Sequence, residues 1–290
     1  MEIFEYQNLS GLKWEHDNPS YIVVVSHGMA EHIERYDYFA NKLVADGACV
    51  FGLDQIGHGK KAGSDLGHWN PGDFNNCVEH FYQLILLLKE RFPDLPIILF
   101  GHSMGSYLTQ QYIKVHGDSV SKVILSGSSK TGALHKMGKF LADFFTYGNQ
   151  KNPNAFLNNL SFGSYNKPFK PNRTEFDWLS RDEKQVDKYV NDPLCGYCCT
   201  TGFFREFLTG LAKLNNGVSS VPKSLPILIL SGDKDPVGAQ GKDTKKLYDM
   251  YIKNGLKNVE IKLYKDGRHE MLNEINKDEV ISDIISWIHQ

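Results

Sequence analysis

The fold of this 290-residue chain is decided by one stretch, Ile97-Ile98-Leu99-Phe100-Gly101-His102-Ser103-Met104-Gly105. Its first four residues form an apolar run typical of a buried strand, and residues 106–116 have helix-compatible spacing without proline. A Gly-x-Ser-x-Gly turn between a strand and a helix is the context that exposes a serine oxygen as a nucleophile. Because the two glycines permit a sharp, strained turn, Ser103 is the candidate nucleophile.

Apolar runs alternate with helical patterns on both sides of this stretch. The runs predict strands at 21–25, 49–53, 97–100, 122–125, 227–230 and 259–263, several of them apolar at nearly every position, as in parallel strands covered on both faces. Helical periodicity surrounds Phe39 and Leu43, continues from 78 to a stop at Pro93, and returns over 278–289. This order predicts an α/β fold with a doubly wound, mostly parallel sheet. The first twenty residues predict an antiparallel hairpin at its edge.

The alternation breaks between residues 130 and 222. This segment has no strong parallel-strand signal, and 15 of its 93 residues are aromatic, against 20 of the other 197. Because it falls between two core strands, it is predicted to be an inserted, largely helical cap (130–222) that divides the core into 1–129 and 223–290. An aromatic-rich insertion near a catalytic turn favours an apolar binding site, although most of these rings are expected to form the cap's own small core.

Composition and charge restrict the function. The net charge is −2, with acidic and basic residues intermixed, which gives no electrostatic reason to expect a nucleic-acid partner. The longest aliphatic runs, 22–25 and 84–88, are too short to span a bilayer. The first residues lack the basic start and apolar segment of a secretory signal, so a cytoplasmic enzyme is expected.

The five cysteines are expected to be reduced, packed thiols. Cys195-x-x-Cys198-Cys199 suggests a metal or redox site, but no second Cys/His pair has a matching spacing. His27 and His32 suggest metal ligands as well, but the sequence shows no suitably placed carboxylate or cysteine partner. Neither a metal nor a cofactor is therefore expected.

A serine nucleophile needs a base, and the base needs an acid that orients it. In this architecture the chain order is Ser, then Asp or Glu, then His, each beyond the carboxyl end of a strand. His269 follows the last predicted strand and is the expected base. Asp235 is the expected acid because Pro236 holds it away from helical geometry, while Asp233 is interpreted as a turn residue or a helper. His102 and His58 are expected to have structural roles.

The oxyanion that forms during acyl transfer needs hydrogen-bond donors prepared in advance. One is expected to be the backbone N–H of Met104, which follows the nucleophile. The second is expected from the loop after an earlier strand, and Met29 in the loop 26–32 is the candidate.

Several motifs together resemble the monoacylglycerol lipase and lysophospholipase branch of the α/β-hydrolases. In chain order these are His27-Gly28-Met29-Ala30-Glu31-His32-x-x-Arg35-Tyr36, Asp54-x-x-Gly57-His58-Gly59, the turn at Ser103, Gly232-x-x-Asp235 and the final His269. The resemblance covers nearly the whole core. It implies the α/β-hydrolase fold with a cap, and it assigns the role of acid to Asp235. Two departures are Lys60-Lys61, where the family often has a small serine, and a cap with only general similarity.

The resemblance and the candidate residues lead to one preferred function and two alternatives. The preferred function is hydrolysis of single-chain acyl esters, such as monoacylglycerols or lysophospholipids, through an acyl-enzyme. An aminopeptidase or amidase needs a cap carboxylate to bind a substrate amine, for which Asp177, Glu183 and Glu206 are available. A non-catalytic binding protein typically loses a triad member, and this chain keeps all three, which argues against that alternative. Epoxide hydrolase or dehalogenase chemistry needs an aspartate at position 103, where this chain has serine. The region 137–145 is either an interfacial helix that contacts membranes transiently or a buried cap helix.

Overall fold

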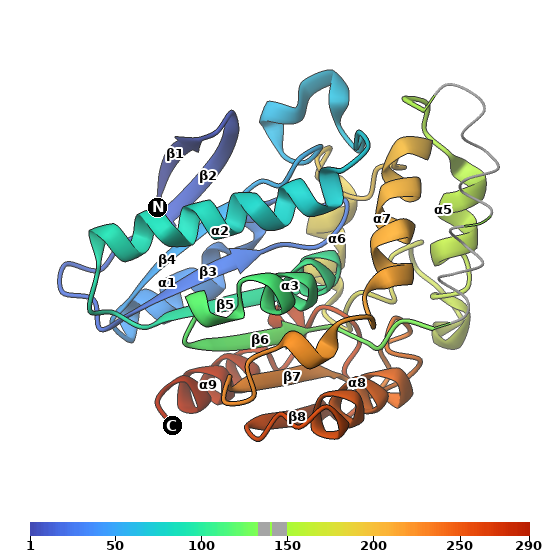
Figure 1. Ribbon diagram of the computed structural model, residues 1–290. Helices are drawn as coiled ribbons and strands as arrows, with labels where there is room; N and C mark the ends of the chain where they lie inside the picture. The colour runs from blue at the N-terminus through green and yellow to red at the C-terminus, as the bar shows by residue number, and fades with distance from the viewer. Residues whose placement is uncertain (133–139, 141–149) are drawn as a thin grey trace.

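The computed structural model describes residues 1–132, 140 and 150–290. Within these residues an eight-stranded sheet forms the centre of the molecule, in the order β1-β2-β4-β3-β5-β6-β7-β8 (Figure 1). The first three strands in this order pair antiparallel, and all the others pair parallel. The strands are β1 (Glu2–Tyr6), β2 (Leu9–Trp14), β3 (Tyr21–Ser26), β4 (Ala48–Leu53), β5 (Ile97–His102), β6 (Lys122–Ser126), β7 (Ile227–Gly232) and β8 (Val259–Tyr264).

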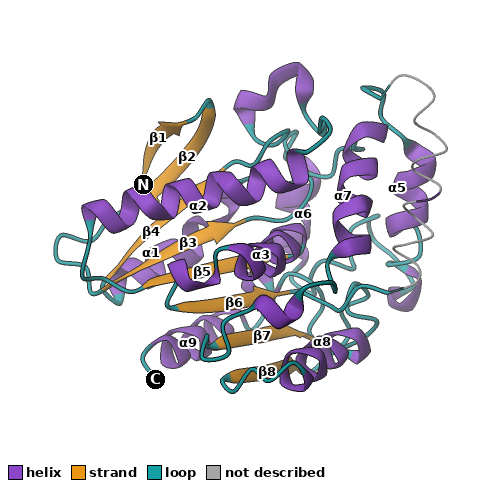
Figure 2. Ribbon diagram, in the orientation of Figure 1, coloured by secondary structure: helices purple, strands orange, loops and turns teal. Residues whose placement is uncertain are grey.

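Helices cover both faces of the sheet (Figure 2). One face packs against α2 (Asp73–Arg91), α3 (Met104–Val115), α7 (Thr201–Lys213) and α8 (Lys242–Lys253), and the other against α1 (Asp37–Ala45) and α9 (Lys277–Ile288). Strand β3 shows why its sequence is apolar throughout: Ile22 and Val24 belong to the first core, and Val23 and Val25 to the second. Short 3-10 helices connect these elements, namely η1 (Ile33–Tyr36), η2 (Lys60–Asp65, kinked at Gly63), η3 (Gly117–Ser119), η4 (Lys167–Phe169), η5 (Val218–Ser220) and η6 (Met271–Asn273).

A helical insertion lies between β6 and β7, beyond the ends of the parallel strands (Figure 1). The α-helices in its described part are α5 (Ala155–Phe162), α6 (Glu183–Asn191) and α7. Helix α7 joins the main core, since the ring centroid of Phe203 lies 4.4 Å from that of Trp69. The boundaries 130 and 222 remain a prediction. The segment 137–145, apart from Phe140, lies outside the described residues.

The architecture agrees with the sequence-based prediction at the level of elements. All six predicted strands are present, and β1 and β2 form the antiparallel edge hairpin. Helix α2 ends at Arg91, two residues before Pro93, as the predicted stop requires. In the part of the chain that the structure describes, no helix combines the length and the apolar character needed to cross a membrane.

Candidate active site

Ser103 lies in the turn between β5 and α3, with φ 51° and ψ −118°. A non-glycine residue adopts such a backbone at a cost of about 1–3 kcal/mol, so surrounding contacts must hold it. Its N–H donates to the carbonyl oxygen of Ser126 at 2.9 Å. The following helix packs closely on the end of β3, because a Cβ added to Gly105 would lie 2.0 Å from the backbone oxygen of Ser26. Glycine at 105 is therefore a steric requirement of the turn.

Asp235 and His269 form a buried pair beyond the ends of β7 and β8. The Nδ1 atom of His269 lies 3.0 Å from both carboxylate oxygens of Asp235, and both side chains are almost fully hidden. The carboxylate also accepts from the Ser231 hydroxyl at 2.8 Å and from the Val237 N–H at 2.9 Å. Asp233 has different contacts, since it accepts the N–H of Asp266, in the loop after β8, at 2.8 Å.

The pair sets the charge of the imidazole. Burial alone would lower the pKa of His269, but the charge of Asp235 and its hydrogen bond outweigh burial and raise that pKa above its ordinary value. For Asp235, burial would raise the pKa, and the attraction of His269 with the surrounding donors instead lowers it. Asp235 is thus held as a carboxylate, and His269 can accept a proton readily.

The turn at Ser103 and His269 lie side by side. The ring of His102, next to the serine, is centred 4.8 Å from the His269 ring. A Cβ at Gly127, which directly follows the hydrogen-bond partner of Ser103, would lie 2.8 Å from Cε1 of His269. Among the described residues, Ser103 Oγ and His269 form no direct hydrogen bond; in enzymes without substrate this contact is often long.

The backbone N–H groups of Met29 and Met104 are available as donors. Within the described residues, neither group donates a hydrogen bond to another protein atom. Met104 is the first residue of α3, where the N-terminal helix dipole favours negative charge. The loop of Met29 lies close to this turn, since a Cβ added to Gly28 would lie 3.3 Å from Cδ2 of His102. In the same loop Ala30, with φ 52°, donates its N–H to Nε2 of His58 at 3.3 Å.

A buried network that the sequence did not reveal connects this loop to the loop of His269. Arg35 binds Glu270 through two hydrogen bonds of 2.8 and 2.7 Å and also binds Glu31. Glu31 in turn accepts the N–H of Gly28 and the hydroxyl of Tyr36. Glu31 and Arg35 belong to a quoted motif and Glu270 follows His269, but their pairing joins positions 235 residues apart.

Three further histidines are buried. Burial lowers the pKa of His27 and of His58 to about 3 and that of His102 to about 4, so these rings are neutral near neutral pH. The ring nitrogens of His27 and His58 bond the backbone of adjacent loops. Nδ1 of His102 lies 3.3 Å from Oγ of Ser126. The structural roles expected for His58 and His102 stay predictions, which these contacts support.

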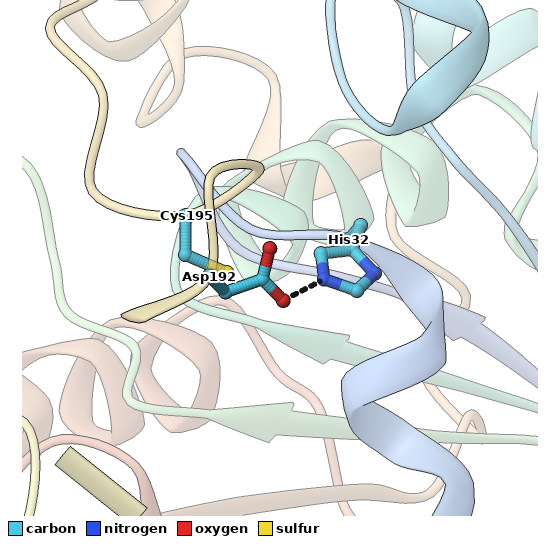
Figure 3. Close-up of side chains that lie close together, drawn as sticks. All are labelled: His32, Asp192 and Cys195. Carbon is cyan, nitrogen blue, oxygen red and sulfur yellow. Dashed lines mark hydrogen bonds and ion pairs between the residues drawn. The ribbon is translucent and has the colours of Figure 1, made fainter. Parts of the chain in front are cut away.

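One expectation from the sequence is wrong. Asp192 and Cys195 lie beside His32, which therefore does have a carboxylate and a cysteine partner (Figure 3). Sequence spacing could not show this, because His32 and Asp192 are 160 positions apart. The five cysteines are free thiols, and four of them are buried.

Aromatic residues of the insertion cover the site. The Trp178 ring lies 5.1 Å from that of His269 and contacts Tyr165 at 5.0 Å and Phe162 at 6.2 Å between centroids. The aromatic rings of α7 pack into the main core instead. The insertion thus places some of its rings in the core and a cluster directly above the imidazole.

Comparison with known proteins supports the interpretation of this site as that of a serine hydrolase. Residues 17–276 match the family described as serine aminopeptidase, S33. The chain is 28% identical to a monoacylglycerol lipase of Mycolicibacterium smegmatis over 95% of this chain and 90% of that protein, and 24% identical to phospholipase YtpA of Bacillus subtilis over 92% and 94%. Among solved structures it resembles a thermostable carboxyl esterase from Bacillus coagulans, with a TM-score of 0.91, 28% identity and coverage of 99% and 97%. The chain is therefore a serine hydrolase with the α/β-hydrolase fold, related to lipases and esterases.

Proposed function

This chain belongs to the α/β-hydrolase family described as serine aminopeptidase, S33, and from that premise we propose that it hydrolyses carboxylic esters of single fatty chains. The substrate classes we propose are monoacylglycerols and lysophospholipids. The observation that carries the proposal is the Asp235–His269 pair beside the strained turn of Ser103, with two peptide N–H groups available next to it.

In the proposed mechanism the hydroxyl of Ser103 attacks the ester carbonyl while Nε2 of His269 takes its proton. Asp235 holds the imidazole through Nδ1 and stabilises its charged form. The N–H groups of Met29 and Met104 bind the oxyanion, each contributing on the order of 3 kcal/mol to lowering the barrier. The imidazolium then protonates the leaving alcohol, and water, activated by the same base, releases the fatty acid from the acyl-enzyme.

The rings above the site support an acyl substrate. Trp178, Tyr165 and Phe162 offer an apolar surface within one ring contact of the proposed base. We propose that the fatty chain lies against this cluster. Transient contact of the cap with a lipid surface is a further proposal.

The insertion does not favour aminopeptidase activity. A carboxylate that binds a substrate amine must be available, yet Asp177 accepts the N–H groups of Arg173 and Thr174. Glu206 accepts the N–H of Gly72 at 2.7 Å, and Glu183 is largely exposed beside Arg173. The three carboxylates that the sequence offered for this role are therefore engaged elsewhere or point to solvent.

Replacement of the nucleophile tests the mechanism. Ser103→Ala should abolish labelling by a fluorophosphonate and hydrolysis of short-chain p-nitrophenyl esters, because it removes the hydroxyl that forms the acyl-enzyme in the proposed mechanism. Ser286→Ala is the matched control, since its hydroxyl bonds only its own helix in α9. Parent-like hydrolysis by the Ser103→Ala protein would show the mechanism to be wrong.

A rate series tests the substrate class. We expect kcat/KM for 1-monoacylglycerols and lysophosphatidylcholines to exceed that for proline anilides, because aromatic rings lie above the site and the three candidate carboxylates are engaged elsewhere or exposed to solvent. A clear preference for the anilides would contradict this assignment and favour a peptidase.

A further inference from the structure

The end of cap helix α6 meets the loop before η1 at three side chains with metal-binding donors (Figure 3). Nε2 of His32 lies 2.8 Å from Oδ2 of Asp192. A ring nitrogen of His32, a carboxylate oxygen of Asp192 and the sulfur of Cys195 all lie within 4.8 Å of one another. The His32 side chain is 8% exposed and that of Asp192 30%, so the cluster is enclosed but reachable from solvent through the carboxylate.

The backbone holds the donors in place. Oδ1 of Asp192 accepts the N–H of Leu194 at 2.8 Å, which leaves Oδ2 directed at His32. The Cys195 N–H donates to the carbonyl oxygen of Asp192 at 3.0 Å, so the carboxylate and the sulfur belong to one tight turn. Such support of ligands by backbone groups is what metal sites require.

The surrounding charge favours a cation. The charged groups buried near Cys195 are Glu31, Glu270 and Arg35, and Asp192 adds a third carboxylate. Among these named groups of the described chain the carboxylates outnumber the guanidinium, and they attract a cation. Burial raises the pKa of the Cys195 thiol, and the charge of Arg35 opposes that rise. A dication at the sulfur would displace the thiol proton.

We propose that His32, Asp192 and Cys195 form a binding site for a divalent transition metal of the zinc class, with a water molecule as fourth ligand. Imidazole, carboxylate and thiolate are the donors that Zn²⁺ and Co²⁺ take in tetrahedral sites. On binding, the metal replaces the thiol proton, which leaves to the buffer, and it takes the place of the His32–Asp192 hydrogen bond. No electron is transferred.

A metal here would also act on the proposed oxyanion loop, an effect that rests on the proposed function. The carbonyl oxygen of Ala30, next to Met29, accepts hydrogen bonds from the Tyr189 hydroxyl and the Gly196 N–H, both at 3.0 Å. Cap residues before and after Asp192 and Cys195 in the sequence therefore both bind the loop of Met29. Bonds of about 2.0–2.3 Å from the metal to its ligands require the Cys195 sulfur to move closer to the other two ligands. They also require the imidazole and the carboxylate, now in hydrogen-bond contact, to move apart. We infer that this displaces the loop and slows hydrolysis.

Cobalt titration of the full-length, reduced protein tests the site without reference to activity. We expect one Co²⁺ per chain and a thiolate-to-cobalt absorption band in the near ultraviolet, which Zn²⁺ abolishes by competition. Cys195→Ser should lose the band, and Asp192→Asn should bind at least about tenfold more weakly. Cys198→Ser, a half-buried thiol in the same segment, is the matched control and should keep it.

Two outcomes would overturn the site: no thiolate band in the parent protein, or a band that persists in Cys195→Ser. The coupling to the loop is tested separately with p-nitrophenyl esters. Zn²⁺ should lower kcat about tenfold in the parent and in Cys198→Ser but not in Cys195→Ser, since a displacement near 1 Å can cost about a hundredfold. Metal binding without a change in the rate would overturn the coupling. If the protein has no esterase activity, the proposed function fails, but the thiolate-to-cobalt band still tests the metal site.

Discussion

The charge of His269 depends mainly on one buried neighbour, Asp235, and to a smaller extent on Glu270 and Glu31. Asp235 is fully hidden and receives hydrogen bonds from the imidazole, a hydroxyl and a peptide N–H, which together satisfy its two oxygens. A carboxylate bound in this way stays ionised and raises the proton affinity of the ring. Since a base must be neutral to act, the raised pKa of His269 sets the pH below which the proposed reaction fails.

The pH profile should show this dependence. The pKa of His269 stands above its ordinary value of 6.5, so kcat/KM for a p-nitrophenyl ester should rise with pH through a midpoint above 6.5. Asp235→Asn removes the main cause of the upward shift, so the midpoint should move to lower pH, and the rate should fall by about 10⁴-fold. Asp233→Asn, the control, should keep the parent midpoint. A midpoint that moves in the control and stays in Asp235→Asn would contradict the assignment.

The choice between the two aspartates was accessible from sequence, whereas the buried network was not. Pro236 and the family resemblance favoured Asp235, and Nδ1 of His269 lies 3.0 Å from that carboxylate in the structure. Nothing local predicts that Arg35 bridges Glu31 and Glu270, because the pairing depends on how two distant loops pack. Local chemistry identifies reactive groups, but the partners that hold them come from tertiary structure.

Among the structural elements, the loop of Met29 and the loop of His269 are joined by Arg35. Its planar fork contacts one carboxylate from each loop, and its guanidinium lies 4.8 Å from the centre of the Tyr189 ring of α6. Lysine keeps the charge but lacks the fork. A lysine at position 35 would still neutralise the carboxylates of Glu31 and Glu270, but it would not fix the two loops relative to each other.

Arg35→Lys should therefore lower kcat for p-nitrophenyl esters about tenfold while changing KM little, since a small displacement of donors acts on the transition state. The matched control is Arg181→Lys, which alters a similar pair, Arg181 with the buried Glu274, in a segment that does not hold the loop of Met29. Equal losses of kcat in the two variants, at equal thermal stability, would show that Arg35 has no specific positioning effect.

The strands were predictable and the cap elements much less so. Buried parallel strands require uninterrupted apolar runs, which leave a direct mark on the sequence. In the insertion, aromatic residues serve either the main core, as Phe203 does, or the cluster above the site, as Trp178 does. Both uses select the same residue types, so composition alone could not separate them.

Viewed as a whole, the molecule has an insertion that shares its core with the sheet. Helix α7 contributes Phe203, Phe204, Phe207, Leu208 and Leu211 to the cluster that also contains α2 and α3. An insertion attached through such a shared core cannot lose its structure without exposing apolar surface of the main domain.

We therefore expect one cooperative unfolding transition. In urea, far-ultraviolet circular dichroism should report the sheet and its helices, and the fluorescence difference between the parent and Trp178→Phe should report the cluster above the site. The two midpoints should coincide. A fluorescence transition at lower urea would show that the insertion unfolds separately.

The contact between Trp178 and His269 has an optical consequence. An imidazolium ion quenches the emission of a neighbouring indole by accepting an electron from its excited state, whereas a neutral imidazole does so weakly. The two rings lie 5.1 Å apart, within the range of such quenching. The fluorescence intensity of Trp178 should therefore report the protonation of His269. A substrate chain that separates the two rings would change this fluorescence.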